Sequence, residues 1–128
     1  MNRQLILTNE AIDEPALVAA RTLSPGMGAC VQFLGFVRGT ETDTPISGLE
    51  YESFRQMAEH QFNLLFDELT RRWPIESVRL VHRLGLVKVN EPSLWVEIIA
   101  PHRAEAFAAC QWLIDEMKRL VPIWKKSA

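Results

Sequence analysis

Two long segments of the chain repeat apolar residues at steps of three and four positions. In the first, residues 55–73, the apolar positions are Ala58, Phe62, Leu65, Phe66, Leu69 and Trp73. In the second, from about Arg103 to Leu120, they are Phe107, Cys110, Leu113, Ile114, Met117 and Leu120. These steps keep side chains on one face of an α-helix, so the pattern predicts two amphipathic helices that pack on a core. A proline follows each segment, at Pro74 and Pro122, and ends the helix.

Shorter segments alternate apolar and polar positions or are rich in β-branched and aromatic residues, which predicts strands. They cover residues 3–8, 29–39, 48–54, 76–85 and 93–100. On the second of these, Val31, Phe33 and Val37 share one face. Gly35 interrupts that strand, which predicts a bulge or a close approach of the backbone. The polar, turn-rich residues 40–47 predict a loop.

A short helix is expected over residues 13–23, where Asp13 can cap the N-terminus and Pro15 sits where its missing N–H does no harm. Runs of neighbouring strands between helices predict an α+β fold, with helices packed on an antiparallel or mixed sheet. The length of 128 residues suits a single domain, 1–128. No G-x-G-x-x-G or P-loop is present, which argues against a nucleotide-binding α/β domain.

Composition narrows the classes of function. The chain is 48% hydrophobic and 23% charged, as in an ordinary globular protein. Its net charge of −2 argues against non-specific nucleic-acid binding, so any anion site must be a local cluster. The cysteines, Cys30 and Cys110, form no CxxC pair and are expected to be packing residues, and no residues have metal-ligand spacing, so no metal or cofactor is predicted. The apolar run within the first ten residues is too short for a signal peptide, and no apolar stretch approaches the length of a membrane-spanning helix. We therefore expect a cytoplasmic, non-membrane protein.

The segment KRLVPIWKK near the end of the chain is a local basic cluster. Lys118 lies in the last turn of the second long helix, where a cation offsets the helix dipole, and this alone is common. Pro122 and Trp124 can fix the segment on the core, so that Lys125 and Lys126 are ordered. Ordered lysines near one point repel each other unless an anion lies between them. A crowded, desolvated lysine also has a lowered pKa and can donate a proton or act as a nucleophile near neutral pH.

Two further motifs carry anion-binding side chains. His102 and Arg103 fall where a strand meets the second long helix, and helix N-termini bind phosphate readily. Arg38 closes a strand before the polar loop. Each motif alone is more often a cap or a surface residue, but together with Lys118 they are expected to converge on one cleft. His82, in an apolar strand, is expected to be a core or interface histidine.

The motifs GFVRG, HRLG, HRAEAFAAC and KRLVPIWKK, in this order, resemble the MoaE family of large, catalytic subunits of molybdopterin synthase, over most of residues 28–126. The resemblance implies an α/β-hammerhead-like α+β fold and a homodimer. It also implies that each large subunit binds a small, ubiquitin-like (MoaD-like) sulfur carrier, giving a heterotetramer, and that the carrier's C-terminal Gly-Gly tail brings a thiocarboxylate into the pocket. The implied substrate is precursor Z, cyclic pyranopterin monophosphate, and the implied product is the dithiolene of molybdopterin. The resemblance implies no metal.

By position, the resemblance assigns catalytic roles to Lys118, at the thiocarboxylate, and to Lys125, at the pterin or its phosphate. The residues themselves leave these two roles exchangeable. It assigns substrate binding to Phe36, Val37, Arg38, His102, Arg103, Lys126 and Ser127.

Two positions depart from the family pattern. Asn90 stands in a turn where Gly is usual, and Asn tolerates the left-handed backbone that such a turn requires. Family members commonly carry a further tail after WKK, whereas this sequence ends at Ala128. A second hypothesis therefore stays open, a non-catalytic homologue that dimerises and binds the small subunit's tail.

Overall fold

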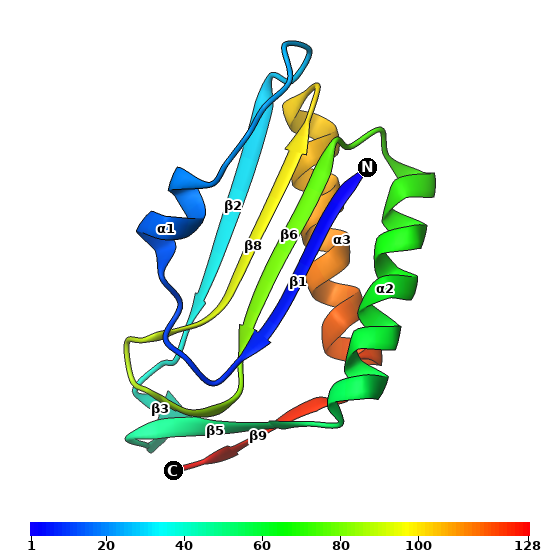
Figure 1. The fold of residues 1–128 in the computed structure, drawn as a ribbon. Helices are drawn as coiled ribbons and strands as arrows, with labels where there is room; N and C mark the ends of the chain where they lie inside the picture. The colour runs from blue at the N-terminus through cyan, green and yellow to red at the C-terminus, as the bar shows by residue number, and fades with distance from the viewer.

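The computed structural model describes all of residues 1–128 and contains three helices and nine strands (Figure 1). In chain order they are β1 (Asn2–Thr8), α1 (Glu14–Ala19), β2 (Ala29–Phe36), β3 (Thr40–Glu41), β4 (Thr44–Pro45), β5 (Gly48–Ser53), α2 (Arg55–Arg72), β6 (Ser77–Arg83), β7 (Gly85–Lys88), β8 (Pro92–Ala100), α3 (Arg103–Leu120) and β9 (Ile123–Ser127). No helix is long and apolar enough to cross a membrane.

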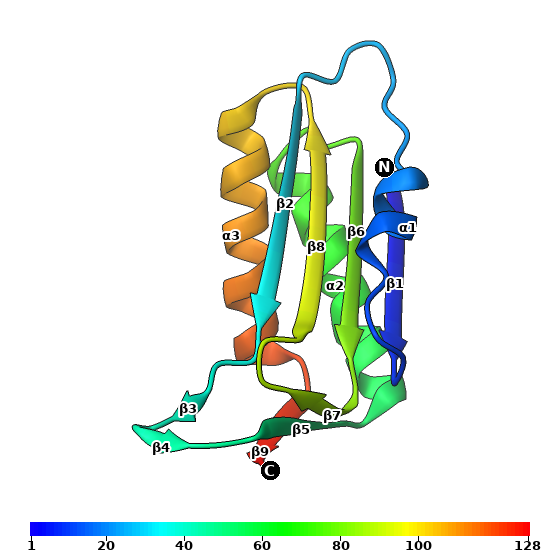
Figure 2. The same cartoon turned by 90° about the vertical axis from the view of Figure 1, so that its left-hand side faces the viewer.

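A mixed four-stranded sheet in the order β1-β6-β8-β2 forms the body of the molecule. β1 pairs with β6 in parallel, and the other two pairings are antiparallel. Helices α2 and α3 cover one face of this sheet, and the short helix α1 lies on the other (Figures 1 and 2). A second sheet, β7-β5-β9, lies across the end of the first, below the ends of β2 and β6 (Figure 1). The predicted α+β fold is confirmed.

The main core lies between the four-stranded sheet and helices α2 and α3. The predicted apolar face of α2 is confirmed, since its buried residues are Ala58, Phe62, Leu65, Phe66 and Leu69. Helix α3 has the predicted bounds, but Phe107 is 61% and Leu120 is 42% exposed. Ala106 and Ala109 are buried against the sheet instead of Phe107 and Leu120, because small side chains let the helix backbone lie close to the strands.

Several local predictions are confirmed. Asp13 caps α1, accepting a hydrogen bond from the Ala16 N–H at 3.1 Å. The register of β2 shifts between Gly35 and Phe36, as expected of a bulge. Asn90 has φ +70°, so it adopts the left-handed turn that its position requires.

Other local predictions were wrong. The helix that begins after Asp13 ends at Ala19 and not at residue 23. Residues 40–47 contain the small β3–β4 hairpin, whose turn is made by residues with positive φ, Thr42 and Asp43. Cys30 is exposed, because it lies on the edge strand β2, whereas Cys110 is buried as expected and burial raises the pKa of its thiol to about 11.

The face of the sheet that α1 covers contains a buried ionic network. The Glu97 side chain on β8 is fully buried and accepts hydrogen bonds from Arg79 Nε and Nη2, both at 2.8 Å, and from Arg21 Nε at 2.7 Å. Arg79 Nη2 also donates to the Leu17 carbonyl, and its guanidinium stacks 4.9 Å from the centre of the Trp95 ring. Helix α1 itself has no buried residue. This network, more than an apolar face, therefore holds the α1 segment on the sheet.

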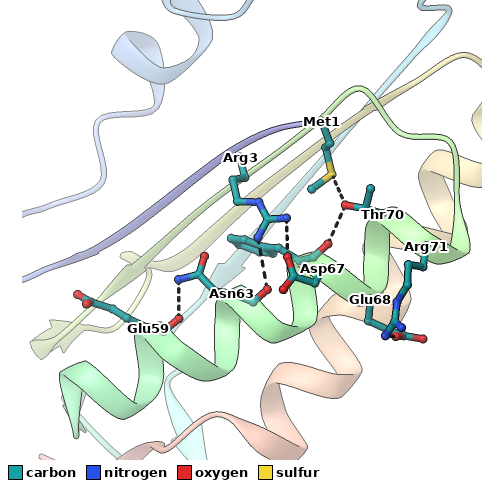
Figure 3. A network of polar contacts seen from close by, with 9 residues as sticks. Met1, Arg3, Glu59, Asn63, Asp67, Glu68, Thr70 and Arg71 are labelled. Atoms are coloured by element: carbon teal, nitrogen blue, oxygen red, sulfur yellow. Dashed lines mark hydrogen bonds and ion pairs between the residues drawn. The ribbon is translucent and has the colours of Figure 1, made fainter.

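A second ionic network, on the surface, joins β1 to α2 (Figure 3). Arg3 Nη2 lies 2.8 Å from Asp67 Oδ1, and Arg3 Nη1 donates to the Asn63 carbonyl at 3.4 Å. The Asp67 side chain is 60% exposed. Because solvent screens exposed pairs, this one contributes roughly 0–1 kcal/mol to stability.

We expect Glu97→Gln to lower the free energy of unfolding at pH 7 by about 3 kcal/mol, because it leaves two half-buried guanidinium groups without their carboxylate. Asp67→Asn is the matched surface control, with an expected loss below about 1 kcal/mol. Urea unfolding of both variants measures the difference. Equal losses would contradict a structural role for the buried network.

The same comparison has a defined pH dependence. Burial by itself raises the pKa of Glu97, but hydrogen bonds and charge from Arg79 and Arg21 outweigh burial and hold this pKa below its ordinary value of 4.5. A carboxylate whose pKa is lowered in the folded state stabilises the fold fully at pH values above its ordinary pKa. This stabilisation is lost as the pH falls through the pKa of the folded state. The difference in the free energy of unfolding between wild type and Glu97→Gln should therefore narrow only below about pH 4.5.

Candidate functional site

A cavity of about 610 Å³ lies where the end of β2, the last turn of α3 and the small sheet meet. Its walls come from β2, β3, β5, β6, β8, α3 and β9, and ten of its seventeen lining residues are hydrophobic. Four of these are aromatic, namely Phe33, Phe36, Tyr51 and Trp124. The cavity thus offers apolar walls of the kind that hold a ring system.

Local backbone structure brings distant residues to this cavity. Pro122 follows the last turn of α3 and directs the chain into β9, which pairs antiparallel with β5. In that pairing Lys125 stands opposite Tyr51, on the face of the small sheet that borders the cavity. Lys118 reaches the same cavity from α3, seven residues earlier in the chain.

Three cations line the cavity, Arg38, Lys118 and Lys125, with a single carboxylate, Glu41. Lys125 Nζ lies 3.6 Å from Glu41 Oε1. Arg38 and Lys118 form no ion pair with any carboxylate of the chain. Unpaired cations of like sign beside one cavity favour a bound anion. Lys118 is exposed in the single chain, so the chain alone does not supply the desolvation that the sequence argument assumed.

Five of the residues assigned to this pocket from the sequence lie elsewhere, namely Val37, Lys126, Ser127, His102 and Arg103. Val37 is 1% exposed and packs with Leu49 and Val87 in a small separate core, because the bulge before it turns its side chain inward. Lys126 points to the opposite face of the small sheet from Lys125, since successive side chains of a strand alternate. Its Nζ lies 3.6 Å from Glu50 and 3.1 Å from Glu52.

Ser127 shares the face of Lys125 but stands beyond the cavity, opposite Leu49 in the pairing with β5. Its side chain is exposed. The expectation that Ser127 lines the pocket beside Lys125 therefore does not match the single chain.

His102 and Arg103 lie at the other end of α3, about 22 Å from Lys118 at a rise of 1.5 Å per residue. There they line a separate hollow with Gly28 and Pro101. His102 occupies the N-cap position of α3, but its side chain makes no capping hydrogen bond, and its Nδ1 lies 2.7 Å from Glu105 Oε1. Within one chain, the expected single cleft therefore contains Arg38 and Lys118 but not His102 or Arg103.

The structure adds residues that sequence reasoning did not place in the site. Tyr51, Glu41 and Trp124 line the cavity because of the β3–β4 hairpin and the β5–β9 pairing, neither of which the sequence predicted. His82 is 6% exposed, as its apolar strand suggested, and yet it also lines the cavity. For Tyr51, the one signal available in the sequence was the strict alternation of residues 48–53, because it places Tyr51 on the same face as Leu49.

Comparisons with known proteins agree on one family. The family model described as MoaE protein matches residues 7–120. The molybdopterin synthase catalytic subunit of Staphylococcus carnosus is 40% identical over 105 residues, 82% of this chain and 70% of that protein. The subunit of the same name from Thermoplasma volcanium is 36% identical over 98% of this chain and 91% of its own length.

Solved structures have the same fold. A crystal structure of molybdopterin synthase from Staphylococcus aureus aligns with a TM-score of 0.85 at 30% identity, over 98% of this chain and 89% of that one. A chain from the complex of subunits 1 and 2 of molybdopterin-converting factor from Helicobacter pylori aligns with a TM-score of 0.78 at 23% identity, over 98% of this chain and 83% of that one. The second likeness concerns the fold alone.

The opposite facing of the two neighbouring lysines gives a direct test of the cavity. Lys125→Met should weaken binding of inorganic phosphate about tenfold, because a hydrogen bond to a charged group is lost. Lys126→Met, the matched control, should change it less than about twofold, because its ammonium is engaged on the far face by exposed glutamates. Calorimetric titration at low salt measures both. Equal losses would place the anion outside the cavity.

Proposed function

Because this chain belongs to the MoaE family, we propose that it is the large, catalytic subunit of a molybdopterin synthase. In this reaction sulfur passes from the thiocarboxylate of a small, ubiquitin-like subunit to cyclic pyranopterin monophosphate, precursor Z. Each transfer forms a carbon–sulfur bond on the substrate, where the sulfur displaces an oxygen. It breaks the carbon–sulfur bond of the thiocarboxylate, whose carbon takes an oxygen from water, so that a carboxylate remains on the small subunit's tail. Two transfers give the dithiolene of molybdopterin. The observation that carries the proposal is the aromatic cavity with its three cations, Arg38, Lys118 and Lys125.

The positions of the cations suit a reaction between two anions. Lys118 lies on α3 and Lys125 on β9, so they approach the cavity from different walls. We assign Lys118 to the thiocarboxylate, as an electrostatic anchor and proton shuttle during transfer. Lys125 and Arg38 then hold the pterin phosphate, to which a guanidinium can make two parallel hydrogen bonds. Phe36 borders the same space from the end of β2.

The partner is a small subunit whose C-terminal Gly-Gly tail enters the cavity. A tail without side chains can pass between apolar walls that lie close together, and its terminal charge then meets the lysines. Phe33, which is 38% exposed, stands at the cavity and offers an apolar contact to such a chain.

The second copy of a homodimer accounts for His102 and Arg103. β2 is an edge strand of the main sheet, and it begins beside Pro101, where Gly28 N donates to the Pro101 carbonyl at 3.2 Å. Antiparallel pairing of two β2 edges about a two-fold axis sets the beginning of one strand beside the end of the other. The His102 end of one copy then lies beside the Arg38 end of its partner.

Exposed aromatic residues follow the same edge. Phe36 on β2 is 55% exposed and Phe107 on α3 is 61% exposed. Trp112 faces α2 through contact with Trp73, so Phe107, about 140° around the helix from it, faces away from α2. An apolar edge of this kind suits burial against a second copy.

Removal of the Lys118 ammonium tests the chemistry. Lys118→Ala should lower turnover of precursor Z by about 100-fold or more, because a charge that acts in the transition state is lost. Binding of the thiocarboxylated small subunit should change only a few-fold, since a protein–protein interface of ordinary size involves many residues besides Lys118. Dithiolene formation and small-subunit affinity are measured side by side. Binding without product in the wild type would instead identify a non-catalytic homologue.

Mixed dimers test the sharing of the site between copies. Lys118→Ala and Arg103→Ala should each be inactive alone. After the two are unfolded and refolded together, about a quarter of the sites should combine an intact Lys118 from one copy with an intact Arg103 from the other. Turnover should therefore return to about a quarter of wild type. A mixture that stays inactive would show that each site uses one chain only.

A further inference from the structure

His82 is a cavity-lining residue that the sulfur-transfer roles above leave unused. It lies near the end of β6, is 6% exposed, and packs edge-on against Tyr51 with ring centres 5.1 Å apart. A histidine in this position is held in one orientation by its neighbours. Its ring nitrogens therefore present fixed hydrogen-bonding groups.

The backbone determines which nitrogen carries the proton. His82 Nδ1 lies 2.7 Å from the carbonyl oxygen of Arg83. A carbonyl oxygen only accepts hydrogen bonds, so Nδ1 must be the donor. In a neutral imidazole Nε2 then has a free lone pair and is an acceptor.

This Nε2 has no hydrogen-bond partner within the chain. It is also absent from the fully buried atoms that lack a partner, which are Ser53 Oγ, Arg83 Nε and Trp95 Nε1. Because His82 lines the cavity, the remaining accessible surface at Nε2 opens into it.

The ring is neutral at physiological pH. Burial lowers the pKa of His82, and the hydrogen bond to the Arg83 carbonyl opposes this shift only in part. The charged groups that line the cavity with it are Arg38, Lys118 and Lys125, which also disfavour a further positive charge, and Glu41, which pairs with Lys125.

We propose that His82 Nε2 accepts a hydrogen bond from an N–H group of the substrate's pterin ring and so fixes the orientation of that ring in the cavity. This inference rests on the proposed function. A pterin carries amino and ring N–H donors, and the lining cations, which only donate, cannot satisfy them. His82 Nε2 is a neutral acceptor beside the aromatic walls. Arg38 and the two lysines bind the anionic groups, and His82 distinguishes one edge of the ring from another.

Nitrogen NMR of the ¹⁵N-histidine-labelled protein with its small subunit tests the proposal on the wild type. Without substrate, the His82 signals should show a protonated Nδ1 and an unprotonated Nε2. Precursor Z should shift the Nε2 signal toward that of a hydrogen-bonded nitrogen, whereas inorganic phosphate, which reaches only the cations, should not. A protonated Nε2, or an Nε2 signal that does not shift when precursor Z binds, would overturn the inference.

Two variants give an independent measure. His82→Phe keeps the ring and removes the acceptor, and it should weaken binding of precursor Z about tenfold while leaving phosphate affinity unchanged. His82→Gln, which restores an acceptor, should recover part of the loss, and His60→Phe on the exposed face of α2 is the control. If His82→Phe bound precursor Z with unchanged affinity, this inference would be overturned but the proposed function would not. A wild type that binds the small subunit but no precursor Z would instead overturn the proposed function.

Discussion

The pairing of β9 with β5 is the constraint on which the candidate site depends. It sets Lys125 opposite Tyr51 and Lys126 opposite Glu50. Since side chains of a strand alternate, a slip of one residue would turn Lys126 into the cavity and Lys125 out of it. Several contacts oppose that slip. Lys126 is paired with Glu50 and Glu52 on the outer face, and Ala128 N donates to the Gly48 carbonyl at 3.0 Å.

Gly48 contributes to the same constraint from the other side of β5. A Cβ at this position would lie 2.6 Å from the Val87 carbonyl oxygen, so only glycine allows β7 to approach β5 this closely. β5 is thereby held between β7 and β9. The central strand of the small sheet is fixed on both edges, and the cavity wall built on it is correspondingly fixed.

The strongly periodic elements could be predicted from the sequence, and the elements that depend on long-range pairing could not. Helix α2 buries the expected stripe, because five apolar side chains repeat over about three turns. The sequence pattern placed Phe107 on the buried face of α3, because periodicity alone does not show that the smaller Ala106 fits more closely against the sheet. β9 was missed altogether, since its five residues form a strand only when β5 is already in place. The motif residues Arg38, Lys118 and Lys125 do meet in space, but the face of Lys126 depends on a register that no local pattern contains.

Charge separates the structural from the functional polar groups of this molecule. Glu97 is fully buried, and two arginines satisfy it, so it has no capacity left for a ligand. The cavity has the opposite arrangement, with three cations and one carboxylate and therefore two net positive charges. A thiocarboxylate and a cyclic phosphodiester each carry one negative charge, so the two proposed reactants together would neutralise the site. A charged His82 would raise the net charge of the cavity from two to three, beside a proposed pterin ring that needs a hydrogen-bond acceptor. Its neutral state thus serves both the charge balance of the cavity and the proposed recognition of the pterin.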